Sequence, residues 1–216
     1  VEPYRMDDAE YALVGMAESA VGVVPDKSPR ELCVEVTLNA VKDAGLTLSD
    51  CDGLIPCNAF AEPILYHAEA VAEYLGWQPR HCVTVNTGGG TTFMAINMAV
   101  AAIAAGMADT IVVAMADSLR SFMTRDQAMV VQSSSGHPHY EQPYGPTVPA
   151  YYALIARAHM DRFGTTEAQF AEAAVSCRTW AHQHPNAQKR ELITVDDVLQ
   201  SRPIADPLKV LDCSLV

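Results

Sequence analysis

The sequence predicts an α/β protein whose mostly parallel sheet is covered by helices on both faces. Short apolar runs alternate along the chain with stretches of helical periodicity, and the connections between them are short. The two central apolar runs, at 82–86 and 110–116, are continuous, as expected for parallel strands that are buried on both sides. The length of 216 residues and the hydrophobic content of 50% are sufficient for a large core.

The first elements are a strand and a well-capped helix. Residues 1–10 are polar and form a lead-in, and the apolar run 12–17 predicts a strand. Ser28 is a good N-cap, the following proline suits the first helical turn, and Glu31 completes a capping box. Apolar residues then recur at helical spacing until Gly45, which ends the helix.

The next elements continue the alternation of strand and helix. In chain order we expect a strand at 52–55, a helix at 63–76, a strand at 82–86, a helix at 91–105 and a strand at 110–116. The helix at 91–105 is apolar almost all round, which predicts a central position in the molecule. Alternation of this kind predicts right-handed crossovers and a parallel sheet.

The pattern stops after residue 116. A long loop rich in proline, tyrosine and histidine occupies 133–146, and loops of this length inside a compact domain usually bind or cover a ligand. Helices are predicted at 148–163 and 167–182, the second with a capping box that starts at Thr166, and a short helix at 194–199. The apolar run 211–216 then predicts entry into a further strand.

Composition excludes several classes of function. The formal net charge of −12 argues against a nucleic-acid or anionic-membrane surface. Residues 93–116 are apolar enough to suggest a membrane span, but Gly106 and Asp109 divide them into a helical and a β-like part. The six cysteines show no CxxC and no metal-ligand spacing, which favours reduced thiols, a cytoplasmic location and no metal.

The most informative segment is 85–92, where a strand turns through three consecutive glycines into a helix. The free N–H groups and the positive dipole end of a helix N-terminus favour negative charge. The predicted substrate-binding residues of this glycine elbow are Asn86, Gly88, Gly89, Gly90 and Thr91. No cysteine, serine or lysine stands there as a nucleophile.

Two other interpretations of the elbow stay open. The glycines could serve only to ease a tight turn between strand and helix. They could also cradle a dinucleotide phosphate, although the spaced third glycine of that fingerprint is missing.

The long loop offers candidates for acid/base chemistry. His139, Tyr140 and Tyr144 are the predicted catalytic residues, with His137 as a neighbour that could line the same pocket. The alternative is a surface loop packed by its own aromatic side chains.

The elbow and its flanks resemble the thiolase superfamily. Val85-Asn86-x-x-Gly89, a small-residue helix start, an Ala-rich helix, and then Gly106-x-Ala108-Asp109 before a hydrophobic strand match the pattern around that family's nucleophile. Similarity extends to its first strand and to its sterol-carrier-protein-type branch through Tyr11–Ser19, Pro143–Pro146 and Arg202–Leu208.

The resemblance implies a thiolase-like fold in which Gly89 occupies the position of the nucleophilic cysteine. The expected fold is a five-stranded, mostly parallel sheet with helices on both faces and an inserted loop and helical region. The expected divisions are an α/β core (1–116), an insertion lining the pocket (117–200) and a return to the core (201–216), which ends before the family's second half. Cys82 is the nearest cysteine in sequence, at the far end of the preceding strand.

The resemblance also implies a reaction without a covalent intermediate. Members of the lipid-transfer-protein-like branch that lack the nucleophile are similar to retro-aldolases of steroid side-chain breakdown, which cleave a β-hydroxyacyl-CoA. Coenzyme A then enters only as part of the substrate, no separate cofactor is expected, and the expected partners are a second copy of the chain and an OB-fold protein. The alternatives are a degenerate thiolase with residual acyl transfer and a non-catalytic acyl-CoA or sterol-binding scaffold subunit.

Overall fold

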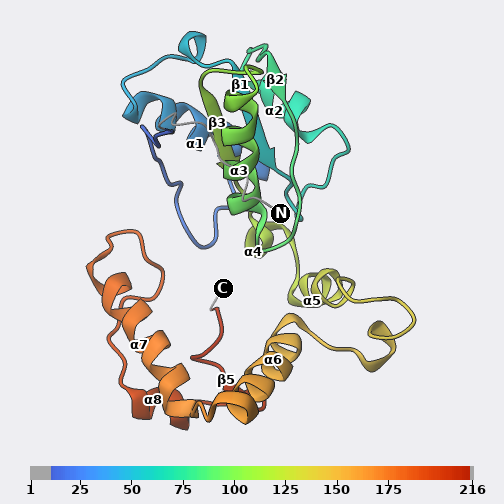
Figure 1. The fold of residues 1–216 in the computed structure, drawn as a ribbon, viewed down its shortest axis with the longest axis vertical. Coiled ribbons are helices and arrows are strands. Elements are labelled where there is room, and N and C mark those ends of the chain that lie inside the picture. Colours follow the sequence, from blue (N-terminus) through green and yellow to red (C-terminus); the bar gives the residue numbers. More distant parts are fainter. Residues whose placement is uncertain (1–10, 215–216) are drawn as a thin grey trace, which may run out of the picture. The chain divides into compact units, whose positions relative to one another are not determined.

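The computed structural model describes residues 11–214, so the predicted lead-in at 1–10 lies outside the described residues. The chain divides into two compact units, 11–122 and 123–214, and each is described by itself (Figure 1). The boundary lies between Phe122 and Met123.

The first unit is built on a parallel three-stranded sheet. Its strands are β1 (Gly53–Cys57), β2 (His81–Cys82) and β3 (Ile111–Met115), in the order β2-β1-β3. The pairing of β1 with β3 is complete, from Gly53 opposite Ile111 to Cys57 opposite Met115. All five residues of β1 are buried, and β1 is the central strand. The runs 82–86 and 110–116, which were expected to be central, instead form the two outer strands of the described sheet and are only partly buried.

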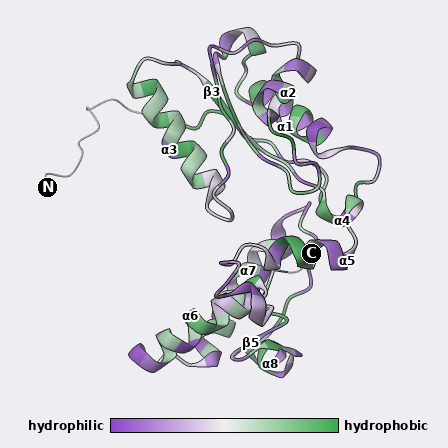
Figure 2. Ribbon diagram, turned by 90° about the vertical axis from the view of Figure 1, so that its right-hand side faces the viewer, coloured by the Kyte–Doolittle hydropathy of each residue, from purple (hydrophilic) through white to green (hydrophobic). Residues whose placement is uncertain are grey.

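Helices cover both faces of this sheet, as predicted. Figure 2 shows α3 (Thr91–Ala104) on one side, and α1 (Pro29–Asp43) and α2 (His67–Tyr74) on the other. Alternate residues of β1 enter two separate cores: Leu54 packs with the α1 and α2 side, and Ile55 packs with α3. The remaining regular elements of this unit are η1 (Leu48–Asp50) and α4 (Leu119–Phe122).

The predicted helix start at Ser28 is confirmed. The Ser28 side chain accepts the N–H of Glu31, the Glu31 carboxylate accepts the N–H of Ser28, and Pro29 occupies the first turn. The second helix begins at His67 instead of Pro63. Loop 58–66 is held by tertiary hydrogen bonds, which override the local helix signal.

The prediction of a first strand at 12–17 is wrong. The segment is extended but pairs with no strand of the described sheet. It lies instead against α1, where the Met16 N–H donates to the Asp43 carboxylate at 2.9 Å. A Cβ on Gly15 would stand 2.3 Å from the Ala40 carbonyl oxygen, so glycine permits this close approach. A cavity of about 470 Å³ is lined both by this segment and by β3.

The expected five-stranded sheet is therefore corrected to three strands among residues 11–214. At 82–86 the regular strand covers only His81–Cys82 and is continued by an isolated bridge at Val85. Near the C-terminus the strands are β4 (Pro203–Ala205) and β5 (Leu208–Lys209), a separate antiparallel pair. The predicted strand entry at 211–216 is not observed: residues 211–214 form no strand, and 215–216 lie outside the described residues.

The second unit is mainly helical. Its helices are α5 (Arg125–Ser133), η2 (Gln142–Tyr144), α6 (Val148–Phe163), α7 (Glu167–Gln183) and α8 (Val195–Gln200). The capping box predicted at Thr166 is present and starts α7. Ion pairs from Arg157 to Asp206 and from Lys209 to Glu167 tie the β4–β5 hairpin to α6 and α7.

No helix in the described part of the chain is both long and apolar enough to cross a membrane. The apolar stretch 93–116 is divided into α3 and β3, as the positions of Gly106 and Asp109 predicted. The apolar α3 is less enclosed than expected, since Phe93 is 74% exposed within the described residues.

The amino ends of the three strands are joined through Asp52. Its carboxylate accepts the N–H groups of Asp109 (2.8 Å) and Thr110 (2.9 Å) and pairs with Arg80 at 2.7 Å. Partial burial alone would raise the pKa of Asp52, but these N–H groups and the Arg80 guanidinium together lower it.

We predict that Asp52→Asn destabilises the protein at neutral pH by about 1–2 kcal/mol, because the charged acceptor of three hydrogen bonds is lost. The pKa of Asp52 is lower in the folded than in the unfolded protein. The extra free energy of unfolding of the wild type over the variant is therefore complete above the unfolded pKa and is lost as pH falls through the folded pKa. Urea unfolding at about pH 7 and about pH 3 measures both effects. Asp26→Asn, on an exposed turn, is the matched control. An equal loss of stability in this control would contradict a specific role of the Asp52 carboxylate.

Candidate functional site

The glycine elbow (86–91) lies at the carboxyl end of the parallel sheet. Val85 forms a parallel bridge with Cys57, and its N–H donates to the Pro56 carbonyl at 3.2 Å. Asn86 thus follows directly on a residue held in register with the end of β1, and by the same register its neighbour is Asn58. The carboxyl edge of a parallel sheet is where α/β proteins usually bind ligands.

Thr91 holds the turn together. Its hydroxyl accepts the Thr87 N–H at 2.9 Å and donates to the Gly88 carbonyl at 2.5 Å, while its own N–H donates to the same carbonyl at 3.1 Å. The side chain is 3% exposed. Its hydroxyl is therefore engaged within the turn.

The first turn of α3 supplies the donors that the elbow can offer a ligand. The hydrogen bonds of the described residues leave the N–H groups of Thr92 and Phe93 without an acceptor, as is usual for the start of a helix. The Gly90 N-cap contributes no side chain. An anionic or polarised oxygen placed there would meet open donors and the positive end of the helix dipole.

The three glycines are not equivalent. Gly88 has φ +66°, a left-handed conformation that disfavours side chains, whereas Gly89 and Gly90 are not left-handed. A Cβ on Gly89 would meet no atom within 4 Å. A purely structural interpretation therefore accounts for Gly88 but not for Gly89. At position 89, neither the backbone nor the local packing of the described chain requires glycine.

No cysteine replaces the missing nucleophile at the elbow. Cys82 is the last residue of β2 and precedes Asn86 by four positions, and burial raises the pKa of its thiol. Cys57, which sequence reasoning did not consider, is closer because it is paired with Val85. Its thiol is only 1% exposed and burial raises its pKa, so it is a poor nucleophile.

The loop with the predicted catalytic residues belongs to the second unit and is folded on itself. The ring of His137 lies 5.8 Å from that of His139 and 4.7 Å from that of Tyr140, centroid to centroid. Gln142 donates to the carbonyls of Ser134 (3.1 Å) and Gly136 (2.9 Å).

The phenol groups of this loop are open to solvent. Tyr140 is 76% exposed and Tyr144 is 85% exposed. The structure thus brings His139 and Tyr140 together around His137. It also brings the five elbow residues together at the start of α3. Roles for either group stay predictions.

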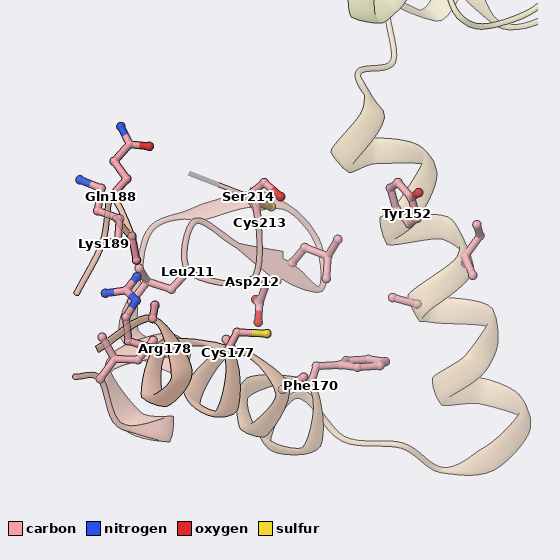
Figure 3. Close-up of a pocket in the computed structure, with 18 of the residues that line it drawn as sticks. Tyr152, Phe170, Cys177, Arg178, Gln188, Lys189, Leu211, Asp212, Cys213 and Ser214 are labelled. Carbon is pink, nitrogen blue, oxygen red and sulfur yellow. The ribbon is translucent and has the colours of Figure 1, made fainter. Parts of the chain in front are cut away.

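The second unit contains a cavity of about 700 Å³ that sequence reasoning missed (Figure 3). It is lined by α6, α7 and the segments 187–193 and 208–214. Figure 3 shows Arg178 and Lys189 on one side, and Phe170 and Tyr152 on the other. A cavity that is largely apolar and has cations at one end suits a ligand with an acyl chain and an anionic group.

No motif in the sequence could have revealed this cavity. Its walls come from segments that are far apart in the chain and meet only through the tertiary fold. The basic residues Arg178 and Lys189 are the signal that the sequence offers, because the chain as a whole is acidic.

Comparisons with known proteins agree with the fold. The sequence matches the family described as thiolase, N-terminal domain, over residues 12–211. It is 29% identical over 208 residues to an acetyl-CoA acetyltransferase of Methanothermobacter thermautotrophicus, covering 95% of this chain and 54% of the relative. It is 30% identical over 217 residues to the 17-hydroxy-3-oxo-4-pregnene-20-carboxyl-CoA lyase of Mycobacterium tuberculosis, covering 96% and 55%.

A solved structure is similar over the same range. The Ltp2-ChsH2(DUF35) aldolase superposes with a TM-score of 0.74 at 29% identity, covering 94% of this chain and 52% of that one. The chain thus spans about half the length of the relatives that it matches.

We predict that Gly88→Ala and Gly89→Ala differ in their effect on stability. Gly88→Ala forces a side chain into the left-handed region and should cost about 1–2 kcal/mol. Gly89→Ala meets no neighbour, so the free energy of unfolding should stay within about 0.5 kcal/mol of wild type. Denaturant unfolding of both variants tests this, and equal losses would show that glycine at 89 is structural.

Proposed function

The chain belongs to the thiolase family through its N-terminal domain, and from this premise we propose that it forms the elbow-bearing half of an acyl-CoA carbon–carbon lyase. The proposed reaction is retro-aldol cleavage of a β-hydroxyacyl-CoA with a steroid or lipid side chain. The observation that carries this proposal is Gly89, which has no side chain where a thiolase-type reaction needs a nucleophile, in a place where a Cβ would fit.

The proposed chemistry needs a base and a site for negative charge. A base removes the proton of the tertiary hydroxyl, the oxygen electrons form the ketone, and the bond between the β- and α-carbons breaks. Its electron pair passes to the thioester as an enolate, which is then protonated to the shorter acyl-CoA. The open N–H groups of Thr92 and Phe93 support a role of the elbow in stabilising the enolate oxygen.

The proposed bases are those of the long loop. His139, Tyr140 and Tyr144 have the right chemistry, and the exposure of both phenols supports access to a substrate. Asn86, Gly88, Gly89 and Gly90 are proposed to face the acyl group, with Thr91 holding the turn. For the second unit by itself, the cavity beside Arg178 and Lys189 is proposed as a binding site for a ligand with an apolar chain and an anionic group.

The relatives include a lyase, which supports the proposed reaction, and an acetyltransferase, which suggests acyl transfer as the main alternative. One relative is a carboxyl-CoA lyase and another an acetyl-CoA acetyltransferase, so residual acyl transfer is the second candidate. The absence of a thiol at position 89 disfavours it, since covalent acyl transfer passes through a thioester on the enzyme.

We further propose a homodimer, a cytoplasmic location and an OB-fold partner. The outer edge of β2 is unpaired in the described sheet, which supports pairing with a second copy. All six cysteines are free thiols, as expected in a reducing compartment. The similar solved structure, the Ltp2-ChsH2(DUF35) aldolase, supports a partner protein.

Cleavage assays with the full-length protein test the lyase. A 3-hydroxyacyl-CoA with a tertiary hydroxyl should yield a ketone and a shorter acyl-CoA, with and without an OB-fold partner. Acetyl transfer between two acyl-CoA molecules is the parallel assay. Binding of the acyl-CoA without any product would favour a non-catalytic scaffold subunit. Acetyl transfer without cleavage would favour a degenerate thiolase.

We predict that side chains at position 89 narrow the acyl site. Gly89→Val should lower kcat/KM for a bulky branched substrate by about 10-fold or more relative to a short-chain substrate, because it fills the space beside the elbow. Gly89→Ala is the graded control and should have a smaller effect. Equal losses for both substrates would mean that position 89 does not face the acyl group.

A further inference from the structure

A cluster of buried polar groups lies beside the elbow and has no part in the chemistry proposed above. Its centre is His67, the first residue of α2, which is 1% exposed. Neither ring nitrogen makes a well-formed hydrogen bond among the described residues, although the Cys57 backbone acts on the ring as an acceptor. Buried polar side chains without partners are uncommon, and each one calls for an explanation.

Charged groups of three other segments act electrostatically on this ring. Arg30 of α1 and Glu62 of loop 58–66 form an ion pair at 2.5 Å, and Asp117 follows β3. The Arg30 guanidinium also stacks over the Tyr74 ring at 4.8 Å. The cluster therefore joins α1, α2, loop 58–66 and the end of β3.

Loop 58–66 depends on this cluster for its position. The Asp117 carboxylate accepts the N–H groups of Phe60 (2.7 Å) and Ala61 (3.2 Å), while Glu62 is held by Arg30. The loop is thus anchored at both the sheet edge and the helix layer. The His67 ring belongs to the same cluster.

A short path leads from His67 to the elbow. The next residue, Ala68, donates its N–H to the Thr84 hydroxyl at 2.9 Å. Thr84 precedes Val85, the residue that is bridged to Cys57, and Asn86 begins the elbow. A shift in the first turn of α2 is therefore transmitted to the strand that carries the elbow.

We infer that His67 is a positioning residue for the elbow, which acts through loop 58–66 and the contact between Ala68 and Thr84. An uncharged ring suits this buried position near the charges of Arg30, Glu62 and Asp117. A protonated ring would place a second positive charge beside Arg30 in a buried site and would loosen the loop and the first turn of α2.

The electrostatic surroundings favour the uncharged ring. Burial lowers the pKa of His67, the Arg30 charge lowers it further, and Glu62, the Cys57 backbone and Asp117 oppose these effects in part. The folded pKa thus lies below the unfolded value. Stability and elbow order are complete above the unfolded pKa and are lost as pH falls towards the folded one.

Hydrogen exchange of the full-length protein tests the positioning role without substrate. Between about pH 7.5 and about pH 5, after correction for intrinsic exchange, protection of 58–66 and 86–92 should fall by about 10-fold in wild type. His67→Gln keeps a polar, uncharged side chain and should remove this dependence. His81→Gln, on β2 of the same unit, is the matched control and should behave as wild type.

Two results would overturn the inference. One is the same acid-induced loss in His67→Gln as in wild type. The other is a loss confined to 58–66, which would show that the path through Thr84 does not reach the elbow. If His67→Gln does not fold, the His67 ring is titrated by NMR in wild type, and a midpoint more than about one pH unit from that of elbow exchange excludes the role.

The pH dependence of cleavage is a second test, which rests on the proposed function and is independent of the exchange measurement. In the cleavage assay, the acid-induced fall of kcat/KM should be smaller in His67→Gln than in wild type and His81→Gln, because the proposed base contributes its own acid limb in every variant. A lack of cleavage in every variant would reject the lyase, while the exchange data would still decide the role of His67. An acid-induced fall in His67→Gln as large as that in wild type would count against His67 alone.

Discussion

Five consecutive residues of β1 pair in parallel with five of β3, and both strands are covered by helices on two faces. Parallel pairing requires crossovers, which α2 supplies between β1 and β2 and α3 supplies between β2 and β3. It also brings the segments that follow β1, β2 and β3 to one edge of the sheet. The elbow, loop 58–66 and Asp117 meet there because their strands run in the same direction. The common direction of the strands therefore determines where the site lies, and no single side chain does so.

Local signals in the sequence predicted those parts of the fold that depend on neighbouring residues. Ser28 and Thr166 cap their helices through side-chain hydrogen bonds that span three positions, and such spacings are visible in a sequence. Strand formation depends on a distant partner, which explains the error at 12–17. The late start of α2 has the same cause, since Glu62 is held by Arg30 from another helix.

The same distinction between local and distant contacts decides which parts of the candidate site could be predicted from the sequence. The elbow is contiguous in the chain and was found from its glycines. The difference between Gly88 and Gly89 depends on backbone torsions and free space, and a run of three identical letters cannot show it. The cavity near Arg178 and the cluster around His67 are assembled from segments far apart in sequence, so neither could be predicted.

The free space at Gly89 has a consequence for how such a site can change during evolution. The scaffold accepts a side chain at this position without a strained backbone or a clash among the described residues. The step between a site with a nucleophile and one without is then a single replacement that leaves the turn, the helix and the sheet intact. Chemistry at this elbow can therefore diverge, or revert, independently of selection for folding.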